Sequence, residues 1–189
     1  MPDMEVLGTF EQSSTSTTNG YVSASFTSIP TTYAHLLWKG AVLNYSSSSS
    51  GFMYVSWNGG AYDAANTYGS SAIGYQGGNP DSFLYTNESI NAFRYVMPAD
   101  DDGANNTSNA RSVFEGWIPF YCGRTSIEQG PQQVFGWAGS RPDGNGTYGS
   151  LTIGGAEKPL VQTDITELTF TFWPGLTAGD SITLYGLKG

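Results

Sequence analysis

The sequence predicts an all-β protein, a jelly-roll-like antiparallel sandwich of about ten short strands with a short N-terminal arm. The 25 glycines and 9 prolines among 189 residues supply turns at short intervals. Aromatic residues make up 14% of the chain, which is typical of a packed β core and not of a disordered acidic chain. Charged residues reach only 12%, so the Lys- and Glu-rich composition of a helical bundle is absent.

The first twenty residues are expected to form an N-terminal arm or a first strand, and residues 21–189 a single β-sandwich domain. A strand signal at residues 5–10 is followed by a polar Ser/Thr tract at residues 12–18. Such a tract packs poorly by itself, and an extended segment can add as a strand to the edge of a neighbour's sheet. The segment 1–18 is therefore the predicted attachment element.

The rest of the chain shows alternating apolar and polar residues between turn-rich segments, as strands do. The expected strands cover residues 21–26, 33–43, 52–57, 89–97, 111–121, 132–138, 147–153, 165–172 and 180–187. Between them, residues 59–82 hold six glycines and are expected to be a long loop or short edge strands. Because Pro119 has no N–H, the strand at 111–121 requires an edge or a bulge there.

Candidate catalytic residues form no recognisable pattern, so we expect no enzyme activity, no cofactor and no metal. His35 is the only histidine and Cys122 the only cysteine, and both are interpreted as structural. The turn that begins at Asp100 resembles a calcium loop, but Arg111 stands where the twelfth-position Glu is required. Four carboxylates near strands were considered as a glycosidase pair and show no spacing that supports one: Glu115, Glu128, Asp164 and Glu167.

The charge balance restricts the partners. A net charge of −9 argues against nucleic acid and against an anionic membrane surface, because both require clustered cations. No apolar run approaches the roughly 20 residues that span a bilayer. The first residues lack the basic and apolar regions of a signal peptide, so we expect the protein to be made in a cytoplasm.

A sugar-binding surface is a further possibility. Aromatic rings can stack on sugar faces while amide side chains bind hydroxyl groups. The loop residues that would do so are Trp57, Asn58, Tyr62, Tyr68, Tyr75 and Trp137. The same aromatic residues are also what a β core and an interface require, so both interpretations stay open.

Three segments carry a resemblance to a known family. The end of the chain, Leu184-Tyr185-Gly186-Leu187-Lys188, resembles the Leu-Tyr-Gly-Ile-Lys type of ending found in β-rich structural proteins of tailed-phage virions. The segment from Phe26 to Leu36, with its Tyr, His and Leu, is similar to that family's early segment. The turn at Trp57-Asn58-Gly59-Gly60 stands where such proteins often carry an aromatic-Asn-Gly-Asp turn, with Gly60 in place of the Asp.

The resemblance implies a non-enzymatic virion protein with a jelly-roll-like fold, located on the phage particle after synthesis in the host bacterium. We expect a head decoration (cement) protein that binds the major capsid protein and stabilises the shell. The alternative is a tail appendage or fibre-tip protein that binds tail proteins of the same virion and a host-surface glycan. The resemblance also implies a homo-oligomer, for which a trimer is the expectation.

Overall fold

A computed structural model was used to determine how these segments fold. The structure describes the backbone of residues 3–15, 21–42, 51–58, 68–76, 82–90, 93–97, 112–122, 132–140, 150–158, 164–173 and 175–189. Side chains are described within residues 3–15, 21–42, 53–58, 113–122, 134–137, 164–172 and 175–189.

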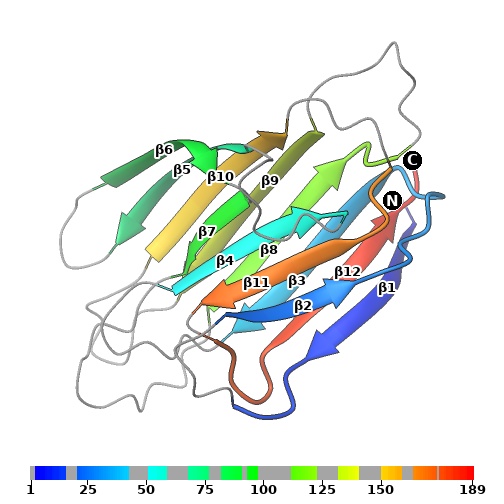
Figure 1. Ribbon diagram of the computed structural model, residues 1–189, viewed down its shortest axis with the longest axis horizontal. Coiled ribbons are helices and arrows are strands. Elements are labelled where there is room, and N and C mark those ends of the chain that lie inside the picture. Colours follow the sequence, from blue (N-terminus) through cyan, green and yellow to red (C-terminus); the bar gives the residue numbers. More distant parts are fainter. Residues whose placement is uncertain are drawn as a thin grey trace.

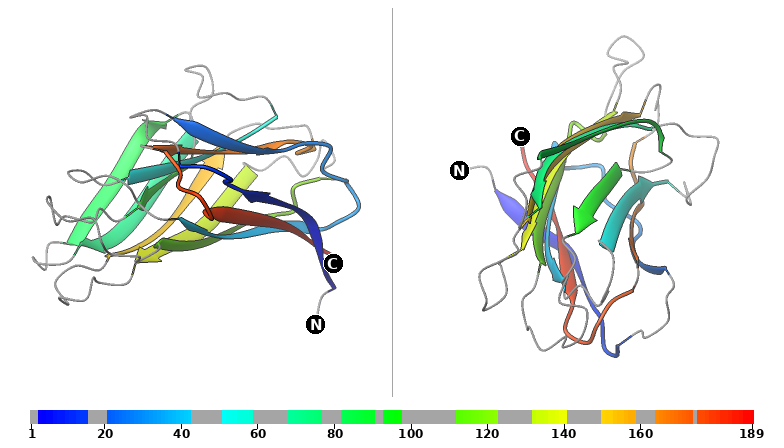
Figure 2. Two further views of the ribbon diagram at one scale, coloured as in Figure 1. Left: turned by 90° about the horizontal axis from the view of Figure 1, so that it is seen from below. Right: turned by 90° about the vertical axis from the view of Figure 1, so that its left-hand side faces the viewer.

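In these ranges the chain is all-β, as the sequence predicts, and its strands form two stacked sheets (Figure 1, Figure 2). The twelve strands are β1 (Met4–Glu11), β2 (Val22–Phe26), β3 (His35–Val42), β4 (Gly51–Trp57), β5 (Tyr68–Gln76), β6 (Ser82–Ile90), β7 (Phe93–Met97), β8 (Ser112–Pro119), β9 (Gln132–Ser140), β10 (Ser150–Lys158), β11 (Leu168–Trp173) and β12 (Ser181–Leu187). The described residues include no helix that is long and apolar enough to span a membrane.

The strand order is that of a jelly roll with two added hairpins. The large sheet has the order β1-β12-β3-β8-β9-β10-β5-β6, and the small sheet has the order β2-β11-β4-β7. The set β1-β12-β3-β8 therefore faces the set β2-β11-β4-β7, and consecutive strands such as β1 and β2 lie in opposite sheets. The hairpins β5–β6 and β9–β10 both extend the large sheet beyond β8. The predicted jelly-roll-like sandwich is confirmed.

The expected arm is a first strand of this chain's own sheet. Met4 pairs with Leu187 and Glu11 with Ser181, so β12 is the hydrogen-bonding partner of β1. The pairing continues past the strand, because the Gln12 N–H donates to the Asp180 carbonyl at 2.8 Å. Residues 4–11 are thus not available as an arm that reaches a neighbour, because their own chain already uses them.

The middle of the chain contains more strand than the sequence indicated. The Gly-rich region contributes β5, and the expected strand at 89–97 is replaced by β6 and β7. The residues of β6, Ser-Phe-Leu-Tyr-Thr-Asn-Glu-Ser-Ile, alternate poorly. Strand formation there depends on the neighbouring strand β5, which sequence periodicity cannot register.

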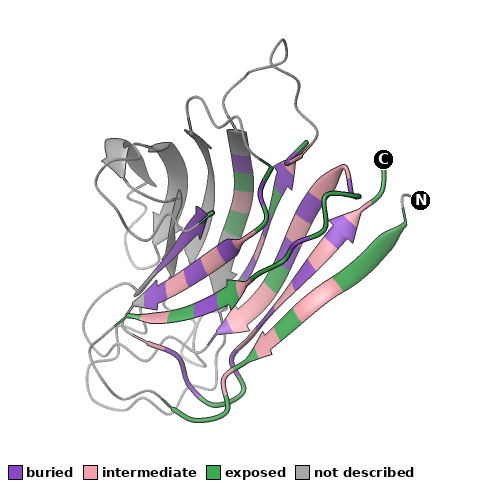
Figure 3. Cartoon of the chain, turned by 45° about the vertical axis from the view of Figure 1, so that its right-hand side comes forward, coloured by how far each residue is buried: buried purple, intermediate pink, exposed green. Residues whose placement is uncertain are grey.

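Aromatic side chains from both sheets meet in the core. Trp38 of β3 packs edge-on against Phe170 of β11 at 5.4 Å between ring centroids. Phe114 of β8 lies 6.0 Å from Phe172 of β11. Burial alternates along the strands, as Figure 3 shows, so each strand presents one face to this core and the other outward. On β11, Leu168, Phe170 and Phe172 form the buried face.

Pro119 is accommodated by its position at the end of β8. Pairing between β8 and β9 stops at Trp117 and Phe135, so β9 requires no N–H from Pro119, which lies opposite His35 of β3. The chain then turns at Phe120, whose φ is 48°. This turn exchanges the two faces: Phe120 is exposed and Tyr121 is buried, opposite to what strict alternation predicts.

Candidate functional site

The outer face of the large sheet carries a row of apolar side chains. Val6, Tyr185, Leu37, Trp117 and Phe135 are successive cross-strand partners on β1, β12, β3, β8 and β9. We call these five residues the apolar row. The rings of Trp117 and Phe135 lie 5.6 Å apart, so the row ends in an aromatic pair.

The apolar row is open to solvent. Val6 is 58% exposed, Trp117 46% and Phe135 38%. Among the described side chains, eight large apolar residues are exposed, and seven belong to this face: Met4, Val6, Val113, Trp117, Phe120, Phe135 and Trp137. Apolar side chains gathered on one face of a sheet mark an interaction surface, whereas scattered ones do not.

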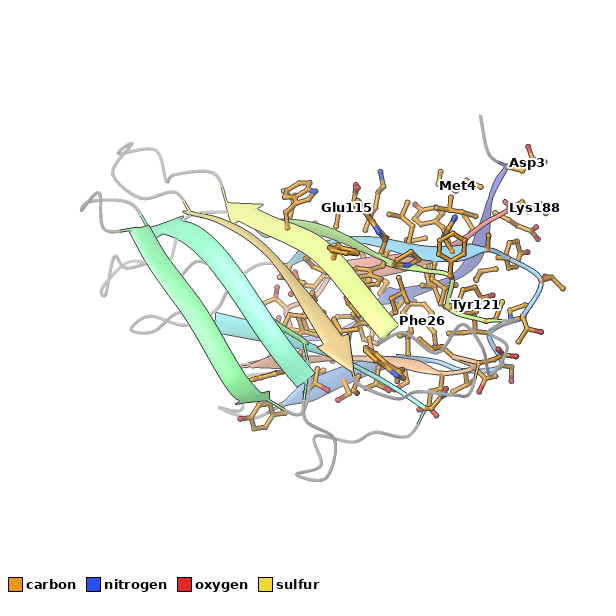
Figure 4. All side chains as sticks on the ribbon, turned by 90° about the horizontal axis from the view of Figure 1, so that it is seen from above. Asp3, Met4, Phe26, Glu115, Tyr121 and Lys188 are labelled. Atoms are coloured by element: carbon orange, nitrogen blue, oxygen red, sulfur yellow. The ribbon has the colours of Figure 1, made fainter. Side chains whose placement is uncertain are left out.

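A second row beside it is polar and locally neutral. Thr9, Thr183, Lys39 and Glu115 are successive partners across β1, β12, β3 and β8. The Lys39 ammonium lies 3.0 Å from the Glu115 carboxylate, and the two threonine hydroxyls are 3.1 Å apart. In Figure 4, Glu115 and Met4 lie on the outer side of the large sheet, while Phe26 lies between the sheets. This row therefore adds no net charge to the face.

One corner of the face is fixed by His35. The Phe120 N–H donates to His35 Nδ1 at 3.2 Å, and the two rings meet edge-on at 4.7 Å. Nδ1 is thus an acceptor, and the imidazole proton resides on Nε2. His35 holds the turn after β8 in place, which agrees with its interpretation as a structural residue.

The outer face of the small sheet is different in character. Ser23 pairs with Thr171 and Ser25 with Thr169, each pair with hydroxyl oxygens 2.9 Å apart. These four side chains point away from the core on β2 and β11. Hydroxyl ladders of this kind suit a surface that stays in water.

Two of the residues expected to bind sugar are part of the framework instead. Trp57 is 1% exposed and belongs to the core, so the expectation of a surface ring there is wrong. Asn58 has a φ of 52°, and its Nδ2 donates to the Asp164 carbonyl at 2.8 Å. Its Oδ1 accepts the N–H of Thr166 at 2.9 Å. The Asn58 amide therefore holds the segment before β11 and is not presented to a ligand.

Among the other predicted sugar-binding residues, the structure describes the side chain of Trp137. Trp137 is exposed on β9, at the end of the polar row opposite Glu115. Tyr68 and Tyr75 lie on β5, for which the structure gives backbone pairing only, and Tyr62 lies outside the described residues. Of the six, Trp137 is the residue placed on the candidate surface.

Cys122, which is partly buried, and Tyr121, which is buried, hold the chain near one end of the sandwich. The Cys122 thiol donates to the carbonyls of Thr31 and Tyr33, both at 3.2 Å, and the Tyr121 hydroxyl donates to the Pro30 carbonyl. Burial raises the pKa of Cys122, with a smaller contribution from the charge of Asp164. Burial also raises the pKa of Tyr121 to about 12. Both groups stay protonated near neutral pH, as the structural interpretation of Cys122 requires.

The acidic candidates that the structure describes lie in two places. Glu115 belongs to the polar row, Asp164 and Glu167 flank the Asn58 contact, and Glu128 lies outside the described residues. The buried Asp180 is used within its own turn, where its Oδ2 accepts the Thr177 N–H at 2.7 Å. Within the described residues, no three His, Cys, Asp or Glu side chains gather as a metal site, and the turn at Asp100 lies outside them.

Two of the three segments that carry the family resemblance contact one another. The Tyr33 ring covers Gly186, where an added Cβ would lie 2.5 Å from the ring. The Ala34 N–H donates to the Leu187 carbonyl at 2.8 Å. The glycine of the Leu-Tyr-Gly ending and the Tyr of the early segment are therefore one packing unit. Together with Asn58, these motifs are framework residues.

No protein-family model matches the chain, and no curated protein and no solved structure shows significant similarity to it. The candidate surface therefore stands on geometry alone.

Sequence reasoning missed the apolar row although it identified the strands. Alternation along the expected strands 33–43 and 111–121 places Leu37 on the same face as Lys39, and Trp117 on the same face as Glu115. What it did not supply is the register that aligns Leu37 with Trp117 and Trp117 with Phe135. The signal that would have found it is the excess of aromatic residues on strand faces that also carry charged residues.

Proposed function

We propose that the chain is a non-enzymatic structural protein of a tailed-phage virion, and more specifically a head decoration protein that binds and stabilises the capsid shell. The observation that carries the structural-subunit part of this proposal is the exposed apolar outer face of the large sheet, and binding to the shell is inferred from the sequence resemblance. A sheet face on which Val6, Trp117 and Phe135 are all exposed suits lasting contact with another protein surface.

The virion assignment itself comes from the sequence resemblance. Two of its three motif segments pack on each other in this chain through Tyr33 and Gly186, and Asn58 of the third holds the segment before β11. Motif residues that pack in the framework support the proposal that this chain shares the fold of the family that it resembles. Attachment to the shell adds buried area at each subunit, and a specific contact of this kind buries about 1,200–2,000 Å² in total.

The test is to locate the protein on the particle and to rebuild the contact. A decoration protein is expected on the head surface, at a copy number that follows the number of capsid subunits. Purified protein added to heads that lack it should cosediment with them and raise their resistance to heat or chelator. Finding it at the tail tip, at a copy number that follows the tail symmetry, would remove the decoration assignment.

The second candidate is a tail protein that binds host glycan, which the exposed ring of Trp137 favours. Its neighbourhood includes Glu115, an acceptor for sugar hydroxyls, directly opposite on β8. Binding to a glycan array that is lost in Trp137→Ala and kept in Tyr21→Ala would support it. Tyr21 is the matched control, since it is an exposed aromatic residue on the other sheet.

A further inference from the structure

We infer that the outer face of the large sheet is covered by a second copy of this chain. This proposal rests on one part of the proposed function, which is that the protein is a structural subunit. It names the occupant of the candidate surface, and it leaves contact with the shell to other surfaces of the resulting oligomer.

The exposed apolar area is sufficient for self-association. A whole aromatic side chain presents roughly 150–250 Å², so the exposed fractions of the four aromatic residues on this face leave about 400 Å² open. These residues are Trp117, Phe120, Phe135 and Trp137, and Met4, Val6 and Val113 add to that area. One side of a stable interface covers about 800 Å², of which somewhat more than half is apolar. The face therefore meets what one partner in a stable dimer needs.

The charge pattern across the middle of the face is compatible with an identical partner, and the exposed Glu11 lies at its edge on β1. When two copies of one surface meet, identical charges approach one another, so unpaired charges of a single sign are unfavourable. The chain carries a net charge of −9, yet across the middle of this face Lys39 and Glu115 neutralise each other at 3.0 Å. A face selected for a strongly charged partner would instead present unpaired charges of the opposite sign.

The geometry of the face also suits packing of one sheet on another. The apolar row runs across five neighbouring strands, from the edge strand β1 to β9, without a charged residue. Flat sheet faces pack at about 10 Å with side chains interleaved. Trp117 and Phe135 stand near the centre of the large sheet, where buried aromatic residues contribute most to binding.

The experiment measures the mass of the full chain in solution over a range of concentrations, by sedimentation velocity and by light scattering after gel filtration. The unchanged chain is expected to be an oligomer at micromolar concentration. Trp117→Ser and Phe135→Ser are each expected to raise the dissociation constant by about 30-fold or more. Tyr21→Ser removes an equally exposed aromatic residue from the other sheet and should leave the dissociation constant unchanged.

A further variant of the same face tests the inference in case Trp117→Ser and Phe135→Ser fail to fold. Val6 lies on the edge strand β1, where a polar residue is tolerated. Val6→Ser is therefore expected to weaken association, with a melting temperature within a few degrees of that of the unchanged chain. A monomeric unchanged chain overturns the inference, as does an oligomer that none of the three face variants weakens. A monomer found on the phage head would overturn this inference alone, whereas an oligomer found on the tail would overturn the decoration function alone.

Discussion

The outward faces of the two sheets carry different kinds of side chain, although both inward faces carry apolar core residues. On the small sheet, outward positions of β2 and β11 carry serine and threonine in hydroxyl pairs such as Ser25 and Thr169. On the large sheet, outward positions of β3, β8 and β9 carry Leu37, Trp117 and Phe135. A sandwich that stays monomeric in water needs polar residues on both outward faces. We therefore propose that the hydroxyl-bearing positions of β2 and β11 face water, whereas the apolar positions of β3, β8 and β9 face another protein surface.

A substitution on the inward face should change the unfolding free energy without changing association. Gly186→Ala, on the inward face of β12, has the largest expected effect. The added Cβ would lie 2.5–2.7 Å from three atoms of the Tyr33 ring, which is itself buried between the strands. Overpacking of this kind costs about 1–3 kcal/mol of unfolding free energy. Chemical denaturation should show this loss. Under conditions in which the variant is folded, the mass of its oligomer should equal that of the unchanged chain.

The matched control for Gly186→Ala lies on the same strand. Ser181→Ala changes an outward position of β12 and is expected to alter the unfolding free energy by less than about 0.5 kcal/mol. If both alanine variants were equally stable, the packing of Tyr33 on Gly186 would not be the reason for glycine in the Leu-Tyr-Gly ending.

The small sheet depends on one amide at its edge, and Asn58→Ala tests this. The substitution removes the hydrogen bonds to Thr166 N–H and to the Asp164 carbonyl, and it places alanine at a φ of 52°. We expect a loss of about 2 kcal/mol in unfolding free energy, since each bond contributes roughly 0.5–1.5 kcal/mol and the backbone strain adds to it.

Asn58→Gly isolates the contribution of the hydrogen bonds, because glycine adopts positive φ without strain. It should cost less than Asn58→Ala but remain destabilising in thermal and chemical unfolding. A glycine variant as stable as the unchanged chain would show that the amide does not hold the segment before β11. Neither variant should alter association, because Asn58 is not on the large sheet.

The sequence supports the prediction of the fold much better than that of the surface. Strand alternation is a local property, so β3, β8 and β11 could be placed with their faces from the sequence alone. The apolar row depends on the register between strands far apart in the chain, such as Val6 with Tyr185, which no local pattern specifies. Trp57 shows the reverse error, since an aromatic residue beside a turn was interpreted as exposed and lies in the core.

The neutral charge of the large-sheet face can be changed without touching an apolar residue. Lys39→Glu places two carboxylates opposite each other on β3 and β8, and the same two on any identical partner. We expect the dissociation constant of the oligomer to rise about tenfold at low salt and to recover partly at high salt, because screening weakens the repulsion. The unfolding free energy should fall by less than about 1 kcal/mol, since Lys39 is half-exposed.

The exchanged pair is the control for Lys39→Glu. Lys39→Glu combined with Glu115→Lys restores one cation opposite one anion, so association should return close to that of the unchanged chain. A double variant as weak as the single one would mean that the orientation of the pair matters, which is the behaviour of a different partner surface and not of a second copy.

The smallest effect is expected on the water-adapted face. Ser25→Ala combined with Thr169→Val removes one hydroxyl pair and keeps the branched side chain that favours β structure. Because Ser25 is exposed, water replaces the lost partner, and the unfolding free energy should change by less than about 1 kcal/mol. The mass of the oligomer measured by sedimentation velocity should not change. A new tendency to associate, produced by so small a gain in apolar surface, would show that the hydroxyl ladder keeps this face apart from other molecules. A loss of association would place the interface on the small sheet and remove the distinction between the two faces.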